Sequence, residues 1–147
     1  STVLMAAIPA RIAGVEEIPW DDGFFSHVVS VESAYYWPDP PAGFREIFRV
    51  LEAQGTVSIL INLYRENVYS HQWAEKLAVP VRILSGEEWC GLLREAGFRE
   101  TRHSRVIDPR PVPDDYQPHW FRSAEEVRRF RREGALLVVG KKPSPGQ

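Results

Sequence analysis

Residues 44–63 of the chain read FREIFRVLEAQGTVSILINL, and this stretch carries the strongest indication of the fold class. Its first half carries apolar residues at the i, i+3, i+4, i+7 spacing of a helix with one buried face, namely Phe44, Ile47, Phe48 and Leu51. Gln54-Gly55 ends this predicted helix. The run 56–63 that follows is rich in β-branched and aliphatic residues, which is typical of a buried strand. The stretch therefore predicts a helix followed by a strand inside a sheet.

The same alternation continues on both sides of this unit. Further strands are predicted at 27–31, 98–107 and 134–141. Further helices are predicted at 67–78, after the capping box of Ser85 and Glu88, and after a second capping box of Ser123 and Glu126. Strands that alternate with amphipathic helices indicate an α/β fold with a mostly parallel sheet and helices on both faces.

Composition favours one globular domain over residues 1–147, with a Pro-rich loop at 108–119 and a flexible tail at 143–147. The net charge of -2 argues against a nucleic-acid-binding domain, which normally has a basic excess. The single cysteine, Cys90, excludes an internal disulfide and a multi-cysteine metal site, and the scattered histidines do not predict a metal centre. No apolar run is long enough for a membrane span, so we expect a cytoplasmic protein.

Several segments resemble, in order, the class I methyltransferases that use S-adenosylmethionine, in particular the methyltransferase type 11 group. Residues 44–51 (FREIFRVL) are similar to that family's LREIxRVLKPGG segment, and residues 89–98 (WCGLLREAGF) to its LLxEAGF segment. Residues 13–20 and 37–39 match the family in the expected order, and residues 135–141 fit its last strand, which is antiparallel. The resemblance covers roughly residues 10–142 and implies a Rossmann-like sheet.

The sequence departs from the family at the cofactor site. Family members carry a glycine-rich turn after their first strand, whereas this chain has no G-x-G and its first glycine is Gly14. Gly14 also stands where many relatives carry an aspartate that faces the adenine. We therefore expect a truncated domain that corresponds to the second part of the methyltransferase fold.

The resemblance implies S-adenosylmethionine as the cofactor and one wall of its crevice. On this basis the adenine would lie beside Gly14, Val15 and Glu16, and the methionine part beside Ser30, Val31 and Glu32. No catalytic residue is assigned, because methyl transfer depends mainly on positioning and desolvation.

Polar and aromatic residues follow the two strands at 27–31 and 56–63, where ligands bind in open α/β sheets. We predict an acceptor site for a small, partly apolar molecule from seven of them: Tyr35, Tyr36, Trp37, Tyr64, Asn67, His71 and Trp73. The alternative is that the aromatic rings only pack a helix on the sheet. His71 could act as a general base, although a lone histidine on a helix is more often a surface residue.

Two functions remain open at this point. One is a methyltransferase that acts on a small molecule and needs a complementary part to be active. The other is a non-catalytic interaction module derived from the same fold. Both predict association, for example a homodimer, because truncation would expose the edge of the strand at 27–31. The arginines after residue 121 alternate with Glu125, Glu126 and Glu133, which favours a solvated, self-paired helix face over a phosphate-binding surface.

Overall fold

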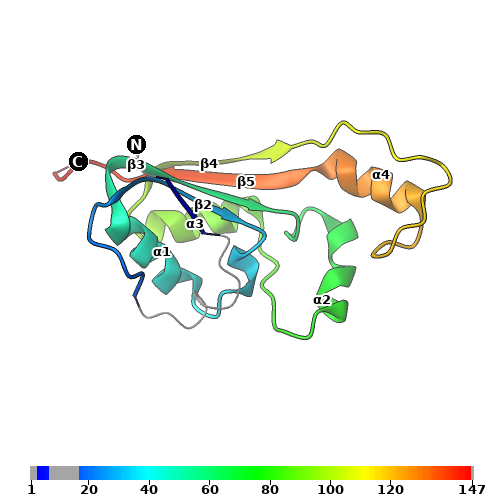
Figure 1. Cartoon of the computed structure of the whole chain (residues 1–147), viewed down its shortest axis with the longest axis horizontal. Helices are drawn as coiled ribbons and strands as arrows, with labels where there is room; N and C mark the ends of the chain where they lie inside the picture. The colour runs from blue at the N-terminus through cyan, green and yellow to red at the C-terminus, as the bar shows by residue number, and fades with distance from the viewer. Residues whose placement is uncertain (1–2, 7–16, 147) are drawn as a thin grey trace.

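The computed structural model describes residues 3–6 and 17–146 (Figure 1). Its elements are, in chain order, β1 (Val3–Ala6), β2 (Phe25–Val31), the 3-10 turn η1 (Ala34–Tyr36), α1 (Pro40–Val50), β3 (Leu51–Ile61), the 3-10 turn η2 (Val68–Ser70), α2 (Gln72–Lys76), α3 (Gly86–Glu95), β4 (Arg99–Val106), α4 (Ala124–Glu133) and β5 (Ala135–Lys141). Within this part of the chain, no helix is long and apolar enough to cross a membrane.

The strands form one five-stranded sheet in the order β1-β2-β3-β5-β4. β1, β2 and β3 are parallel, and β5 runs antiparallel to both β3 and β4. The predicted α/β class is confirmed, as is the mostly parallel, Rossmann-like sheet with an antiparallel last strand. Parallel neighbours also end together, so β2 and β3 present their carboxyl ends at the same edge of the sheet.

β1 was not predicted, and it changes the expectation of an exposed edge at β2. Val3–Ala6 pairs in parallel with His27 to Ser30, so the edge of β2 is covered by another strand of the same chain. The edge strands of the described sheet are therefore β1 and β4. A four-residue apolar run is too short for sequence periodicity to identify, because only its partner strand gives it a place.

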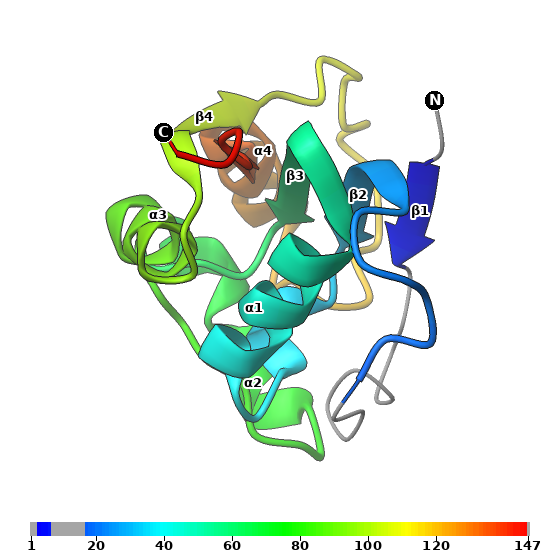
Figure 2. The ribbon, with the colours of Figure 1, turned by 90° about the vertical axis from the view of Figure 1, so that its left-hand side faces the viewer.

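α1 and α3 form the layer that covers one face of the sheet (Figure 2). The contacts come from Phe44 and Ile47 of α1 and from Trp89 and Leu93 of α3, all of which are buried. Their partners on the sheet include Val28, Val57, Ile59, Leu136 and Val138, which point to the same face because side chains alternate along a strand. This layer is the hydrophobic core.

The opposite face of the sheet differs from the expectation of helices on both faces. In the described ranges no helix covers it, and α4 lies beyond the end of the sheet, packed beside η2 (Figures 1 and 2). Its central residues are apolar and either half-buried or, for Val31, exposed, and we call this set the open face: Val29, Val31, Leu60, Leu137 and Val139. Amphipathic periodicity predicts where helices form, but it does not indicate which face of the sheet each helix covers.

α1 begins and ends differently from the predicted helix. Asp39 caps it by accepting a hydrogen bond from the backbone N–H of Ala42 at 3.1 Å, and Pro40 and Pro41 fit its first turn. The helix ends at Val50, and β3 starts at Leu51 rather than at Thr56, because Leu51 pairs with Phe25 of β2. Pairing with β2 therefore places in a strand the residues from Leu51 onward that the periodicity predicted at the helix end.

The helix predicted at 67–78 is wrong in its extent, because the structure has the turn η2 followed by the five-residue α2. The Asn67 carbonyl accepts hydrogen bonds from both the backbone N–H and the hydroxyl of Ser70, which fixes a 3-10 turn instead of an α-helix. At the other end, the helix stops at Lys76 because Leu77 already has an extended backbone, and Pro80 disfavours a return to helical geometry at Val79.

Arg49 ties the segment before β2 to α1. Its guanidinium donates to the carbonyls of Ile18 and Trp20 at 2.8 and 2.9 Å, and to Asp22 Oδ1 at 2.7 Å. It also makes a two-pronged contact with Glu46, which in turn accepts the backbone N–H of Ile18 at 2.7 Å. One arginine thus satisfies acceptors from two distant segments, and it holds the start of β2 against the helix.

Candidate functional site

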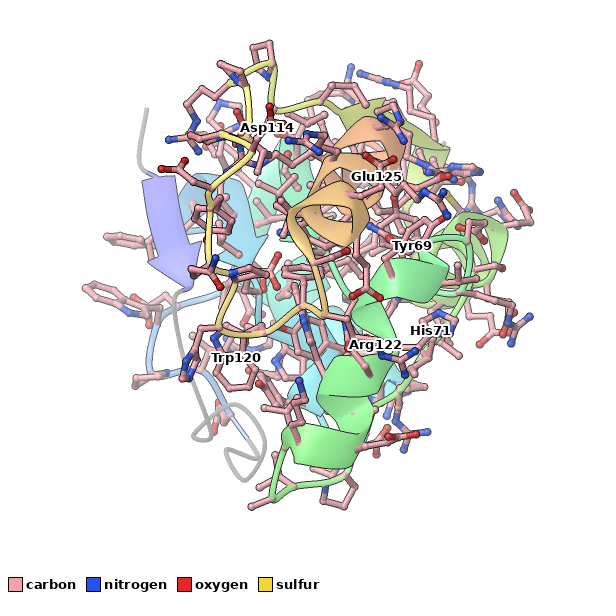
Figure 3. The ribbon with its side chains drawn as sticks, turned by 90° about the vertical axis from the view of Figure 1, so that its right-hand side faces the viewer. Tyr69, His71, Asp114, Trp120, Arg122 and Glu125 are labelled. Carbon is pink, nitrogen blue, oxygen red and sulfur yellow. The ribbon has the colours of Figure 1, made fainter. Side chains whose placement is uncertain are left out.

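The candidate site lies where β2 and β3 end. Val31 pairs with Leu60, and the backbone N–H of Glu32 donates to the Leu60 carbonyl at 2.8 Å. The two strands therefore end side by side at the same edge of the sheet. Figure 3 views this end of the molecule, where η2, α4 and the segment before α4 gather around the carboxyl ends of the strands. This edge is where open α/β sheets bind ligands.

The Glu32 carboxyl group is held from both sides. The Tyr35 hydroxyl donates to Glu32 Oε2 at 2.8 Å, and Asn62 Nδ2 donates to Glu32 Oε1 at 2.8 Å. Glu32 follows β2, Tyr35 comes from η1, and Asn62 follows the last residue of β3. We call this group the Glu32 cluster (Glu32, Tyr35 and Asn62). The structure brings together residues that lie 30 positions apart in the chain.

Burial dominates the electrostatics of this cluster. It raises the pKa of the Glu32 carboxyl above its ordinary value, although the hydrogen bonds from Tyr35 and Asn62 partly oppose the shift. Burial and the neighbouring carboxyl group raise the pKa of the Tyr35 hydroxyl, which therefore stays a neutral donor at ordinary pH. A carboxyl group with a raised pKa at a ligand-binding edge is a candidate for proton transfer.

The residues predicted to hold the cofactor are only partly described. Gly14, Val15 and Glu16 lie outside the described residues. Ser30, Val31 and Glu32 are consecutive at the end of β2, as the sequence placed them. Val31 is 38% exposed on the open face, whereas Ser30 is fully buried and its hydroxyl has no hydrogen-bond partner among the described residues.

The three aromatic residues after β2 fall into different environments. Tyr35 is buried in the Glu32 cluster, and the half-buried Tyr36 packs its ring at 4.6 Å from that of Tyr35. Trp37 is part of the hydrophobic core: it is 2% exposed, its indole N–H donates to Ser33 Oγ at 3.1 Å, and its ring packs edge-on against Phe44. Tyr35 and Tyr36 therefore lie at the carboxyl edge of the sheet, whereas Trp37 lies in the hydrophobic core.

Tyr64 is buried in a contact between strands. Its hydroxyl donates to the Gly134 carbonyl at 2.6 Å, and Arg105 Nη1 donates to the same hydroxyl at 2.9 Å. Arg105 also lies over the Tyr64 ring and pairs with Glu133 at 3.3 Å, so this tyrosine joins the end of β3 to β4 and α4. Burial raises the pKa of its hydroxyl, which keeps it a donor.

The remaining predicted acceptor residues form a separate group around η2. His71 Nε2 lies 3.0 Å from the Tyr64 carbonyl, and the Asn67 N–H donates to that same carbonyl at 3.2 Å. The Asn67 side chain is fully buried, and its amide has no partner among the described residues. Trp73 packs against Phe130 of α4 at 5.3 Å. A buried amide left without a partner is rare in native structures, which marks Asn67 as a position for a ligand or a water molecule.

The arginine-rich α4 flanks this group (Figure 3). Glu125 contacts three of its arginines at 3.4 Å, namely Arg128, Arg129 and Arg132. Arg128 also reaches Asp114 in the preceding segment at 2.5 Å. These pairs match the predicted self-paired helix face. In the figure Tyr69 of η2, His71 between η2 and α2, and Arg122 just before α4 line the same side of the molecule.

Sequence reasoning missed Asn62. The residue was included in a buried strand predicted at 56–63, and its amide was therefore overlooked. The signal was nevertheless present, because a polar residue that directly follows the run ILI marks the point where the strand leaves the core. The partner, Glu32, follows β2 in the same way.

Comparisons with known proteins agree with this architecture. Residues 3–59 match the family described as methyltransferase domain. The chloroplastic 2-methyl-6-phytyl-1,4-hydroquinone methyltransferase of Spinacia oleracea is 29% identical over 136 residues, which cover 89% of this chain and 33% of that protein. The chain thus spans about a third of the length of this curated relative.

Solved structures show the same fold. The methyltransferase in a complex with the Haloferax volcanii Trm112 methyltransferase activator has 32% identity and a TM-score of 0.78, and the match covers 88% of this chain and 59% of that one. A SAM-dependent methyltransferase from Thermotoga maritima has 23% identity and a TM-score of 0.64, with 86% and 60% covered. The cofactor of this family is S-adenosylmethionine. The family match over residues 3–59, the sheet order and these relatives support a class I S-adenosylmethionine-dependent methyltransferase fold for the chain.

Proposed function

We propose that the chain forms one wall of the active site of a methyltransferase that transfers a methyl group from S-adenosylmethionine to a small molecule. The observation that carries this proposal is the Glu32 cluster, which places a partly buried carboxyl group at the carboxyl ends of β2 and β3. Ser30, Val31 and Glu32 would border the methionine part of the cofactor, and Gly14, Val15 and Glu16 would border the adenine.

The opposite wall of the crevice would come from polypeptide that this sequence does not contain. The chain has no G-x-G turn, and it spans about a third of the Spinacia oleracea relative. In the proposed assembly this part contributes acceptor-side residues, while the complementary part contributes the glycine-rich turn that lets backbone approach the cofactor closely.

A small aromatic acceptor suits the residues at this edge. Tyr36 offers a half-buried ring beside the Glu32 cluster, and Asn67 offers an amide that has no partner in the part of the chain that the structure describes. Aromatic surface with a few polar groups is typical of pockets for partly apolar ligands. The related Spinacia oleracea protein is a hydroquinone methyltransferase by name, which supports an acceptor of this class.

Calorimetric titration with S-adenosylmethionine tests the proposal. We expect saturable binding with a Kd on the order of micromolar. Val31→Arg should weaken binding by about tenfold, because it places a cation near the positively charged sulfonium, at a cost of about 1.4 kcal/mol. The matched control is Val79→Arg, on an exposed residue between α2 and α3, which should bind as the original chain does. No binding at millimolar ligand would contradict a role in cofactor binding.

The second candidate function is a non-catalytic interaction module, and the open face favours it. Apolar patches that a protein leaves half-exposed on a sheet often mark interaction surfaces. The methyltransferase similar to this chain was solved together with a protein activator, so a protein partner is a reasonable proposal here as well. A homodimer is one form of this proposal, with the open face as the contact instead of the edge of β2.

Light scattering distinguishes this module from a monomer. We expect the chain to associate, and Val139→Lys to shift it toward the monomer because the variant places a charge in the middle of the open face. Val79→Lys provides the matched control on an exposed site away from that face. A strictly monomeric chain at high concentration would argue against self-association.

A further inference from the structure

Glu32 has an unusual backbone for its residue type. Its φ is 52°, in the left-handed region that side chains other than glycine rarely adopt. Two other non-glycine residues of the described chain share this feature, and both lie in strand irregularities: Gln54 within the shifted register between β2 and β3, and Glu100 within that between β4 and β5. Glu32 follows the last regular pair of β2, so no bulge accounts for it. Such strain concentrates at functional sites.

The Glu32 carboxyl group also has no cationic partner within residues 3–6 and 17–146. Among the described residues none of the ion pairs involves Glu32, whereas Glu46, Glu66, Glu87 and Glu133 each contact an arginine. A carboxyl group that is largely buried is normally paired with a cation, because burial otherwise disfavours its charge. Here neutral donors hold it in place, namely the Tyr35 hydroxyl and the side-chain and backbone N–H groups of Asn62, and they leave part of its acceptor capacity unused.

The Glu32 cluster already contains a hydrogen bond from a phenol to this carboxyl group. The hydroxyl of Tyr35 is itself a phenol, and it donates to Glu32 Oε2 at 2.8 Å. The adjacent ring of Tyr36 lies 4.6 Å from the Tyr35 ring and is half-exposed, so a second aromatic molecule could pack beside it. Among neutral hydroxyl groups, phenols release their proton most readily to a carboxylate.

We propose that Glu32 is the proton acceptor for a phenolic methyl acceptor, a role that rests on the proposed methyltransferase function. The phenolic O–H bond breaks, and its proton passes to a Glu32 carboxylate oxygen. The oxygen electron pair then forms the bond to the methyl carbon, the bond from that carbon to the sulfonium sulfur breaks, and its electron pair returns to sulfur. The products are a methyl ether, a neutral thioether and a protonated Glu32, which returns its proton to solvent. Tyr35 and Asn62 act as positioning residues for the carboxyl group.

Binding of 4-nitrophenol to the full chain tests this role without methyl transfer, because the absorbance of this probe reports whether it is bound and ionised. We expect Glu32→Gln to weaken binding by about tenfold or more, since it removes a charged hydrogen-bond acceptor. Glu87→Gln makes the same chemical change at an exposed carboxylate that pairs with Arg94, and it should bind as the original chain does.

The outcomes separate this inference from the proposed function. Equal binding by the original chain and Glu32→Gln would overturn the role of Glu32, and so would an absence of 4-nitrophenol binding by the original chain. If circular dichroism shows that Glu32→Gln is unfolded, loss of binding in a folded Glu32→Asp variant supports the role, and full binding overturns it. Binding that depends on Glu32 in a chain that does not bind S-adenosylmethionine would keep the phenol site and remove the methyltransferase assignment.

Discussion

Trp37→Ala is expected to lower the free energy of unfolding by about 3–5 kcal/mol, the range found when a large buried aromatic residue is truncated. Trp37 is 2% exposed and packs against Phe44, and α1 approaches its ring so closely that a Cβ on Gly43 would lie 2.9 Å from it. The structure around such a site relaxes only partly, so the variant leaves a cavity. Urea unfolding followed by fluorescence and circular dichroism measures the change.

The matched control is Trp120→Ala. Its side chain is 46% exposed in the segment before α4, so we expect a change within about 1 kcal/mol. This pair also separates two interpretations of Trp37. A tryptophan that serves mainly as a wall for the acceptor would change ligand binding and leave stability almost unaffected, and such a result would contradict its place in the core.

Arg49→Met should lower the free energy of unfolding by about 2–3 kcal/mol at pH 7, because it leaves Glu46, Asp22 and two backbone carbonyls without their donor. Arg45→Met, one turn earlier on the same helix and exposed, is the control and should stay within about 0.5 kcal/mol. Equal loss in the two variants would contradict the anchoring role of Arg49.

The pH dependence gives Arg49 a second test. The hydrogen bond from Arg49 holds the pKa of the Glu46 carboxyl below its usual value. A group with a lowered pKa stabilises the fold above its unfolded pKa, about 4.3 for glutamate, and loses that contribution as the pH falls through the folded pKa. The difference between the original chain and Arg49→Met should therefore shrink between pH 5 and the acid limit of folding. A difference that stays constant over this interval would exclude the linkage to Glu46.

Local sequence signals predicted much of the architecture. The spacing of Phe44 and Ile47, the serines that cap α3 and α4, and Gly97 after α3 each act over one or two turns, so periodicity could find them. Ser85 Oγ accepts the N–H of Glu88 at 3.0 Å as the capping box requires, whereas the Glu88 carboxylate pairs with Arg65 instead of with its own helix end. The local sequence pattern correctly predicted the cap by the Ser85 hydroxyl, but it could not predict that Arg65 binds the Glu88 carboxylate.

Features that depend on distant partners could not be predicted in the same way. β1 is a strand only because Val3–Ala6 meets β2, and the open face arises because α1 and α3 both cover the other side of the sheet. The candidate site shows the same limit. Glu32 and Tyr35 were named from their place after a strand, but the bond to Asn62 depends on the pairing of Val31 with Leu60. Trp37, two positions from Tyr35, turns into the core, which no local pattern distinguishes.

An NMR titration with S-adenosylmethionine tests whether the carboxyl edge of β2 and β3 faces the methyl donor. We expect the amide signals of Ser30, Val31, Glu32 and Asn62 to shift together and saturate, while those of the exposed Val79 and of Glu87 on α3 do not move. Saturation with shifts confined to residues away from this edge, or no shift at millimolar ligand, would contradict this expectation.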